Sequence, residues 1–318
     1  MSLFASLDLG TNTFRLLIAE VVNVDTLVPV ITRRAITRLG EGIYKNASIQ
    51  DKAIERSLKV LKDFSKTINH YKADKVFAVS TSATRDAKNG KEFIYQVYKQ
   101  TGIQVRILSG LEEAKLTLKG VFSVVDRAPK RSLVFDIGGG STELILTEGN
   151  NIVKTASIRL GVVHLAESLI TSDPPAAREL SHLRKYINNS MVLSDLTIDN
   201  RIIKSSHASS MQSILIGTAG TITTLAAIDQ QMDQYNPLKI NNYKLSRETI
   251  EKIYHQLSSS PISKRRKIPG LEEGREDVII PGTAIVLEIM DYFGFNKLIV
   301  SDAGLLEGIL LDAQTTSH

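Results

Sequence analysis

The sequence contains no cysteine and no tryptophan among its 318 residues. The absence of cysteine excludes a disulfide scaffold, a thiolate metal site and a cysteine nucleophile. No run approaches the roughly 18 apolar residues of a membrane-spanning helix. The start, Met1-Ser2-Leu3-Phe4, shows neither the basic stretch nor the apolar core of a signal peptide. We therefore expect a cytosolic protein that does not bind membranes.

Neither sign of charge dominates the sequence, because the formal net charge is only +5. This small excess suits an anionic, phosphate-rich ligand. A nucleic-acid partner is not expected, since no recognition module and no interleaved stacking aromatics accompany the basic residues. The length suits two domains of ordinary size, each able to bury its own core.

Two acidic, glycine-containing turns are the most informative segments that are present. Residues 8–13 read Asp-Leu-Gly-Thr-Asn-Thr, and residues 136–142 read Asp-Ile-Gly-Gly-Gly-Ser-Thr. A tight glycine turn can point several backbone N–H groups at one anion, while the preceding aspartate can hold a cation through water. Either turn alone could be an ordinary hairpin, since its residues are common turn formers. The pair predicts phosphate and metal chemistry.

The second half of the chain repeats the pattern of the first half. Alternating and apolar runs predict strands at residues 3–9, 14–22 and 27–36, and again at 133–137, 142–146 and 152–157. Each set of strands is followed by a segment in which apolar residues recur at helical spacing. Two copies of one βββα unit predict an α/β fold with domains at residues 1–124 and 125–303. A C-terminal helix at about 304–318 is expected to pack back on the first domain.

The motifs occur in an order that resembles one family. They are residues 8–16, Ser80 to Asn89, Leu108 to Ala114, Asp136 to Leu144, Arg159-Leu160-Gly161, Gly217 to Thr221, Pro281-Gly282 and Ser301 to Gly308. This series resembles the exopolyphosphatase and guanosine pentaphosphate phosphohydrolase (Ppx/GppA phosphatase) family, in its short two-domain form. That family belongs to the actin, sugar-kinase and chaperone ATPase superfamily. The resemblance implies two duplicated actin-like, ribonuclease H-like domains with mixed five-stranded sheets, and an active site in the cleft between them.

Glu113 is the candidate base that activates the attacking water, because Gly110 lets the backbone bend into a helix whose first turn carries this acid. Arg85 is expected to fork onto a phosphate, helped by hydroxyls such as that of Ser82. The alternatives are that Glu112 and Glu113 only favour the helix dipole, and that residues 80–84 only cap a helix.

Asp136 and Glu143 are the proposed anchors of a Mg²⁺ ion, with Mn²⁺ as the other divalent candidate, and Asp8 completes the metal side. Magnesium takes few carboxylates and keeps several waters, which suits two acids flanking a glycine turn. The competing interpretation is that Asp136 caps its own turn and that Glu143 faces solvent. Phosphate contacts are expected from the two turns: Gly10, Thr11, Asn12, Thr13, Arg15, Gly138, Gly139, Gly140, Ser141 and Thr142.

Two further segments are candidate phosphate or nucleotide sites. Gly217, Gly220 and Thr221 precede an apolar helix, where free N–H groups favour an anion, although a plain strand-to-helix turn fits as well. The densest basic run, Lys264, Arg265, Arg266 and Lys267, could form a cationic track for a long polyanion or a solvated surface.

The resemblance implies an enzyme that releases terminal phosphate from inorganic polyphosphate, or the 5′-phosphate of guanosine pentaphosphate in the stringent response. The alternatives are an ATP-dependent small-molecule kinase of the same superfamily and a non-catalytic phosphate- or nucleotide-sensing module. The resemblance also allows a homodimer.

Overall fold

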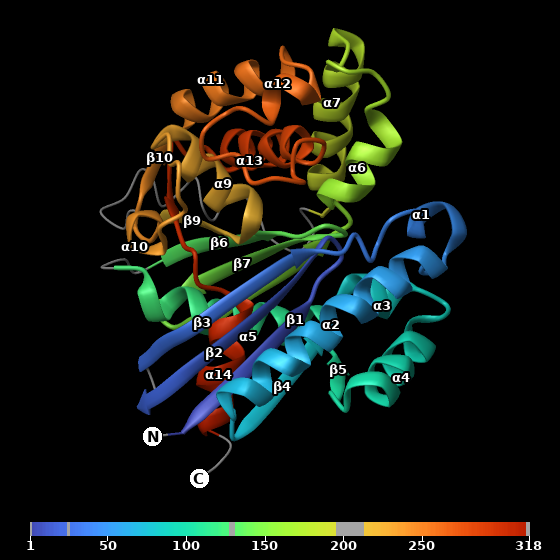
Figure 1. The fold of residues 1–318 in the computed structure, drawn as a ribbon. Coiled ribbons are helices and arrows are strands. Elements are labelled where there is room, and N and C mark those ends of the chain that lie inside the picture. The colour runs from blue at the N-terminus through green and yellow to red at the C-terminus, as the bar shows by residue number, and fades with distance from the viewer. Residues whose placement is uncertain (1, 24–25, 127–130, 195–212, 316–318) are drawn as a thin grey trace. The chain divides into compact units, whose positions relative to one another are not determined.

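The computed structural model describes residues 2–23, 26–126, 131–194 and 213–315. The chain divides into two compact units. Unit 1 comprises residues 1–123 and 303–318, and unit 2 comprises residues 124–302. Each unit contains one mixed β-sheet flanked by helices (Figure 1). No helix in the described ranges is long and apolar enough to cross a membrane.

Unit 1 is built on a five-stranded sheet. Its strand order is β3 (Thr26–Ile36), β2 (Thr13–Asn23), β1 (Leu3–Leu9), β4 (Lys75–Ser80) and β5 (Val105–Ile107). The first three strands are antiparallel, whereas β4 and β5 run parallel to β1. Its helices are α1 (Ile43–Asn46), α2 (Asp51–Tyr71), α3 (Ser82–Asp86), α4 (Gly90–Thr101), α5 (Gly110–Val124) and α14 (Leu305–Thr315).

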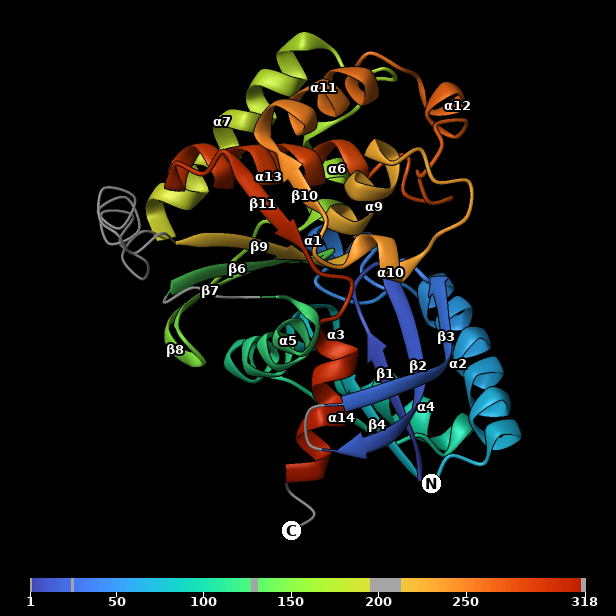
Figure 2. The ribbon, with the colours of Figure 1, turned by 90° about the vertical axis from the view of Figure 1, so that its left-hand side faces the viewer.

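The two faces of this sheet are covered by different helices. Leu16 belongs to the core that includes Leu58 and Leu61 of α2, whereas Leu17 packs with Leu306 of α14. Successive residues of a strand point to opposite faces, so α2 and α14 lie on opposite sides of the sheet (Figure 2). α14 ends at Thr315, and the last three residues of the helix expected at 304–318 lie outside the described residues.

α14 and α5 approach each other closely through glycines. A Cβ atom on Gly308 would overlap the backbone carbonyl of Leu116, and one on Gly120 would overlap the carbonyl of Gly304. The close approach therefore depends on residues without side chains.

Unit 2 repeats the strand order of unit 1 and adds one strand. The order is β10 (Lys244–Ser246), β11 (Lys297–Val300), β9 (Ile214–Thr218), β6 (Arg131–Ile137), β7 (Thr142–Glu148) and β8 (Asn151–Ile158). The duplication is thus confirmed, but the expectation of two five-stranded sheets is wrong for unit 2. The sixth strand, β10, has only three residues, too few to show a periodic pattern in the sequence.

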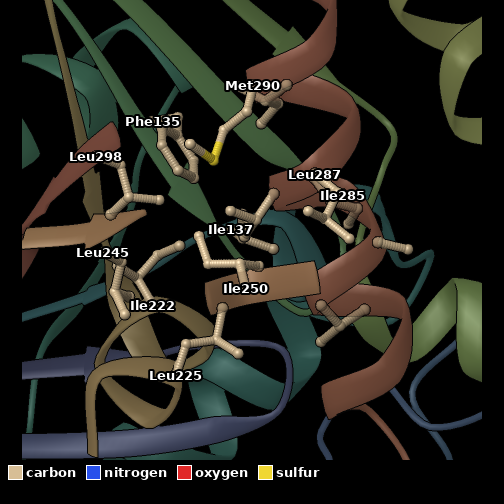
Figure 3. Close-up of a cluster of buried hydrophobic side chains, with 14 of the residues drawn as sticks. Phe135, Ile137, Ile222, Leu225, Leu245, Ile250, Ile285, Leu287, Met290 and Leu298 are labelled. Carbon is tan, nitrogen blue, oxygen red and sulfur yellow. The ribbon is translucent and has the colours of Figure 1, made fainter. Parts of the chain in front are cut away.

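The helices of unit 2 enclose its larger core. They are α6 (Val162–Leu169), α7 (Ala177–Ser194), α9 (Ala219–Asp229), α10 (Pro237–Ile240), α11 (Arg247–Ser258), α12 (Ile262–Arg265) and α13 (Ile279–Phe293). α13 is buried along almost its whole length. Figure 3 shows its Leu287 and Met290 beside Phe135 and Ile137 of β6 and Ile222 of α9. This core holds the β6–β7 turn in place.

A pair of asparagines in unit 2 connects the two points at which the chain passes between the units. The side-chain amide of Asn242 donates to the carbonyl of Val124 at 2.8 Å and accepts from the N–H of Asp126 at 2.7 Å. The side chain of Asn241 accepts from the N–H of Asp302 at 2.7 Å. Asn242 has a φ of 63°, a left-handed conformation that asparagine tolerates better than most residues. One dipeptide therefore ties both ends of unit 2 together.

Candidate functional site

In unit 1, Asp8 and Arg15 lie opposite each other on β1 and β2. The Arg15 guanidinium donates to Asp8 Oδ2 from Nη2 at 2.7 Å and from Nε at 3.1 Å. Only 6% of Asp8 is exposed. The predicted metal anchor and the predicted phosphate ligand of this strand pair therefore partly neutralise each other.

The turn that joins these strands, residues 10–13, is held by its neighbours. The carbonyl of Asn12 accepts from the N–H groups of Thr37 and Arg38, and the hydroxyl of Thr11 lies 2.9 Å from that of Ser82. Asn12 is buried, and its Oδ1 atom has no hydrogen-bond partner within the described residues. Buried polar atoms normally have a hydrogen-bond partner, so this oxygen can accept a hydrogen bond from a water or from a ligand.

The hydroxyl-rich segment after β4 also reaches this turn. Ser80 Oγ donates to the carbonyl of Leu9 at 2.9 Å, and Thr84 Oγ1 donates to Ser80 Oγ at 2.7 Å. Thr81 occupies the N-cap position of α3 but makes no capping hydrogen bond with its side chain. The hydroxyls thus bind the segment to β1 and to the first turn, which argues against a simple helix cap.

Arg85 and Glu113 come together beside this segment. Arg85 Nη1 donates to Glu113 Oε2 at 3.4 Å and to the carbonyl of Leu108 at 3.2 Å. The Glu113 side chain is 11% exposed and that of Arg85 is 27% exposed. The structure therefore brings the predicted base and the predicted phosphate-binding arginine into contact.

Glu112, by contrast, serves the helix itself. Its carboxylate accepts from the N–H and the hydroxyl of Ser109, and its own N–H donates back to the Ser109 hydroxyl. This is a capping box at the start of α5. The hydrogen bonds from Ser109 lower the pKa of Glu112, first from the backbone and then from the side chain. The two adjacent glutamates thus have different partners: Ser109 for Glu112 and Arg85 for Glu113.

In unit 2, Asp136 and Glu143 lie directly opposite each other on β6 and β7, so their side chains share one face of the sheet. Glu143 is 3% exposed, and its Oε1 accepts from the hydroxyls of Ser141 and Ser157, each at 2.8 Å. The interpretation of Glu143 as a solvent-facing residue is therefore wrong. Ser157, on β8, is a contact that the sequence analysis missed.

The glycine turn between these strands is supported by the start of α6. The N–H groups of Val162 and Val163 donate to the carbonyls of Gly138 and Gly139. A Cβ atom on Gly161 would overlap the backbone of Gly139 and Gly140. The Arg159-Leu160-Gly161 motif thus has a structural purpose, because the turn can approach α6 only where a side chain is lacking.

The fit of a metal can be judged from the donor set. Asp136, Glu143 and the Ser141 hydroxyl supply only oxygen, which is what Mg²⁺ prefers. No group of three or more His, Cys, Asp or Glu residues that could hold a metal occurs in the part of the chain that the structure describes. Two carboxylates suit a magnesium ion that keeps several of its waters, and the same set does not suit zinc.

The Gly217–Thr221 segment forms the junction of β9 and α9. A Cβ atom on Gly220 would overlap the guanidinium of Arg275, whose Nε donates to Glu272 Oε2 at 2.5 Å. Arg275 is 9% exposed and lies at the positive end of α9. This arginine was not predicted, because 54 residues of chain separate it from Gly220 and no local pattern connects them.

The basic run at residues 264–267 does not form one surface track. Arg265 is 2% exposed, and its guanidinium donates to Asp173 Oδ1 at 2.7 Å and to the carbonyl of Glu276. Arg266 pairs with Glu276 at 3.1 Å. Arg265 is therefore a buried residue that links two loops, which corrects its prediction as a polyanion ligand. Within the run, only Lys264, Arg266 and Lys267 are exposed.

Comparison with known proteins gives the family. Residues 17–317 match the model of the Ppx/GppA phosphatase family. Exopolyphosphatase 2 of Mycobacterium tuberculosis is 30% identical over 96% of this chain and 97% of its own length. The crystal structure of the Aquifex aeolicus member of the Ppx/GppA family superposes with a TM-score of 0.79 and 29% identity, covering 100% of this chain and 99% of that one.

A further relative is the bifunctional 3-dehydroquinate synthase/phosphatase of Fusobacterium nucleatum, 37% identical over 97% of this chain. The chain spans 46% of that protein's length, so the similarity concerns only part of it. The family model and the full-length relatives agree with the order of motifs read from the sequence. The chain belongs to the Ppx/GppA phosphatase family.

Proposed function

We propose that the protein is an exopolyphosphatase, which hydrolyses the terminal phosphoanhydride bond of inorganic polyphosphate, and that guanosine pentaphosphate is a second substrate at its 5′-phosphate. The partly buried contact between Glu113 and Arg85 carries the proposal, because it joins a candidate proton acceptor to a candidate phosphate-binding cation. The names of the full-length relatives support the class of reaction.

In the proposed reaction, the oxygen of a water attacks the terminal phosphorus while Glu113 takes the proton of that water. The bond from phosphorus to the bridging oxygen breaks, and the shortened chain leaves with the electron pair. The products are orthophosphate and a polyphosphate one unit shorter. A carboxylate accepts this proton in its ionised form, and the guanidinium of Arg85 lies 3.4 Å from the Glu113 oxygen.

The phosphoryl oxygens need positive charge and N–H donors around them. In unit 1 we assign this purpose to Arg85 and to the backbone N–H groups of the turn at residues 10–13. In unit 2 we assign it to the backbone N–H groups of the turn at residues 138–142. Asp136 and Glu143 would hold the Mg²⁺ ion, with the Ser141 hydroxyl beside them. A bound ion would neutralise part of the phosphate charge.

Phosphate release in the presence of Mg²⁺ tests the proposal directly. The substrates are polyphosphates of several lengths, guanosine pentaphosphate and ATP, each with and without a sugar or other kinase acceptor. Release from polyphosphate without an acceptor supports the assignment. Transfer from ATP to an acceptor would instead identify a kinase, and binding without turnover would identify a sensor.

A further inference from the structure

The excess positive charge of the chain lies entirely in unit 1. Residues 1–123 and 303–318 contain 19 Lys and Arg against 14 Asp and Glu, whereas residues 124–302 contain 20 of each. The basic run at 264–267 belongs to the neutral unit 2, and two of its arginines are engaged with acidic partners there. A surface for a long polyanion is therefore better sought on unit 1.

An exposed row of cations in unit 1 lies on α2. Lys52, Lys59, Lys62 and Lys66 fall within about 80° of the helix circumference and extend over about 21 Å of its length. All four are exposed. The buried residues of α2 face the sheet on the other side of the helix, so the lysines project into solvent. We call these four residues the α2 lysine row.

Most lysines of this row form no ion pair within the described residues. Lys52, Lys59 and Lys62 have no ion-pair partner among the residues that the structure describes, whereas Lys66 lies 3.2 Å from Asp63. Glu55 and Asp63 reduce the charge of this face without cancelling it. Arg33, on the edge strand β3, is exposed on the same side of the sheet, since it lies opposite Leu16 of the α2-facing core.

The row is connected to the first phosphate turn. Arg56, in the second turn of α2, donates to the carbonyls of Thr37 and Arg38. The N–H groups of those two residues donate to the carbonyl of Asn12 in the turn. α2 thus starts at the support of the phosphate turn and runs away from it along the sheet (Figure 1).

We propose that the α2 lysine row binds the distal part of a linear inorganic polyphosphate whose terminal phosphate is held at the first turn. This inference rests on the proposed function and adds a second, length-dependent binding surface. A row of point charges suits phosphates that repeat along a chain, and the binding gains free energy from released counterions. Nucleic acid fits less well, because between Lys52 and Lys66 α2 exposes no aromatic side chain on which bases could stack, and only His70 is exposed one turn beyond the row.

The test is a variant with Lys52→Gln, Lys59→Gln, Lys62→Gln and Lys66→Gln. A matched control replaces the exposed, unpaired Lys154, Lys185, Lys239 and Lys244 of unit 2 by Gln, which removes the same charge. Two measurements are made: equilibrium binding of polyphosphate of several hundred units, and KM and kcat on that polymer and on tripolyphosphate. The binding measurement does not depend on turnover, so it decides the inference even if the parent protein hydrolyses no polyphosphate.

We expect the α2 variant to bind the long polymer roughly 10- to 100-fold more weakly at low salt, with a log–log salt slope lower by about 3. KM for the long polymer should rise with kcat unchanged, and tripolyphosphate should be unaffected. Equal losses in the control variant, or equal losses on tripolyphosphate, would overturn the proposal. So would a single-stranded DNA of equal charge that binds the parent as tightly as polyphosphate does.

Discussion

The Glu113 carboxylate lies 3.4 Å from the guanidinium of Arg85, although 27 residues of chain separate the two side chains. If Glu113 is the base, Glu113→Gln should keep the fold and substrate binding but lose about 100- to 10,000-fold in turnover. Phosphate release under saturating polyphosphate measures this loss. The change removes one charge and almost no volume, so circular dichroism should match the parent.

Glu112→Gln is the control for this prediction. It removes the same charge from the neighbouring residue, whose carboxylate caps α5 at Ser109. We expect at most a small loss of stability, because the amide oxygen of Gln can still accept from Ser109, and nearly normal turnover. Turnover in Glu113→Gln as high as in Glu112→Gln would eliminate Glu113 as the base.

The metal assignment predicts a shift in magnesium activation. Asp136→Asn and Glu143→Gln should each raise the Mg²⁺ concentration that gives half-maximal activity, because each removes a negatively charged ligand. Ser157→Ala should cause a smaller shift, since it removes only a hydrogen bond that orients Glu143. Titration of phosphate release with Mg²⁺ measures all three, and activation curves identical to the parent would show that the ion binds elsewhere.

Unit 2 carries an acid-sensitive contact at the start of α7. Hydrogen bonds from the side chains of Ser172 and Thr171, and from the N–H of Ala176, lower the pKa of Glu179 to about 2. A lowered pKa in the folded state stabilises the protein above the unfolded value of 4.5, and this contribution is lost as the pH falls through about 2. Glu179→Gln should therefore have a lower melting temperature than the parent at pH 7.

The pH dependence of that difference is the sharper measurement. The two melting temperatures should converge as the pH falls from about 4.5 to about 2, because the parent's carboxylate becomes protonated over that window. The effect is expected to be small, since Glu179 is solvent-exposed and water screens its charge. A constant difference across this pH range would mean that the hydrogen bonds do not depend on the charge.

Much of the fold could be predicted from the sequence because its signals are local. The apolar strands before Asp8 and Asp136 and the glycine turns after them predicted both hairpins, and the repeat predicted the duplication. The pairing of Asp136 with Glu143 follows from the same hairpin. The edge strand β10 could not be predicted from the sequence. It has only three residues, and its partner β11 lies about 50 residues later in the chain.

The contacts that the sequence analysis missed are long-range and chemically ambiguous. Arg265 belongs to the most basic run of the chain, yet Asp173, 92 residues away, compensates its burial. Arg275 covers Gly220, which precedes it by 55 positions. A charged residue looks the same in sequence whether it binds a ligand or an internal partner, so the basic composition of residues 264–267 favoured a surface role for Arg265.

Asn242 provides a prediction that does not depend on the reaction. Asn242→Gly keeps the left-handed backbone but removes the two side-chain hydrogen bonds to Val124 and Asp126. We expect a loss of about 1–3 kcal/mol in the free energy of unfolding. Denaturant unfolding measures it, and Asn236→Gly, which removes the cap of the short helix α10, is a control at a site away from the crossing segments. Equal, negligible losses of stability in both variants would show that Asn242 does not stabilise the segments at which the chain passes between the units.

The division of unit 1 into residues 1–123 and 303–318 has a consequence for biosynthesis. Leu306 and Leu310 of α14 cover Leu17 and Ala19 of the sheet, and they are translated only after the whole of unit 2. Unit 2 is continuous in sequence, whereas unit 1 needs segments from both sides of it. The first part of the protein to be made is therefore the last to be completed, because Leu17 and Ala19 lack their covering residues until α14 has been made.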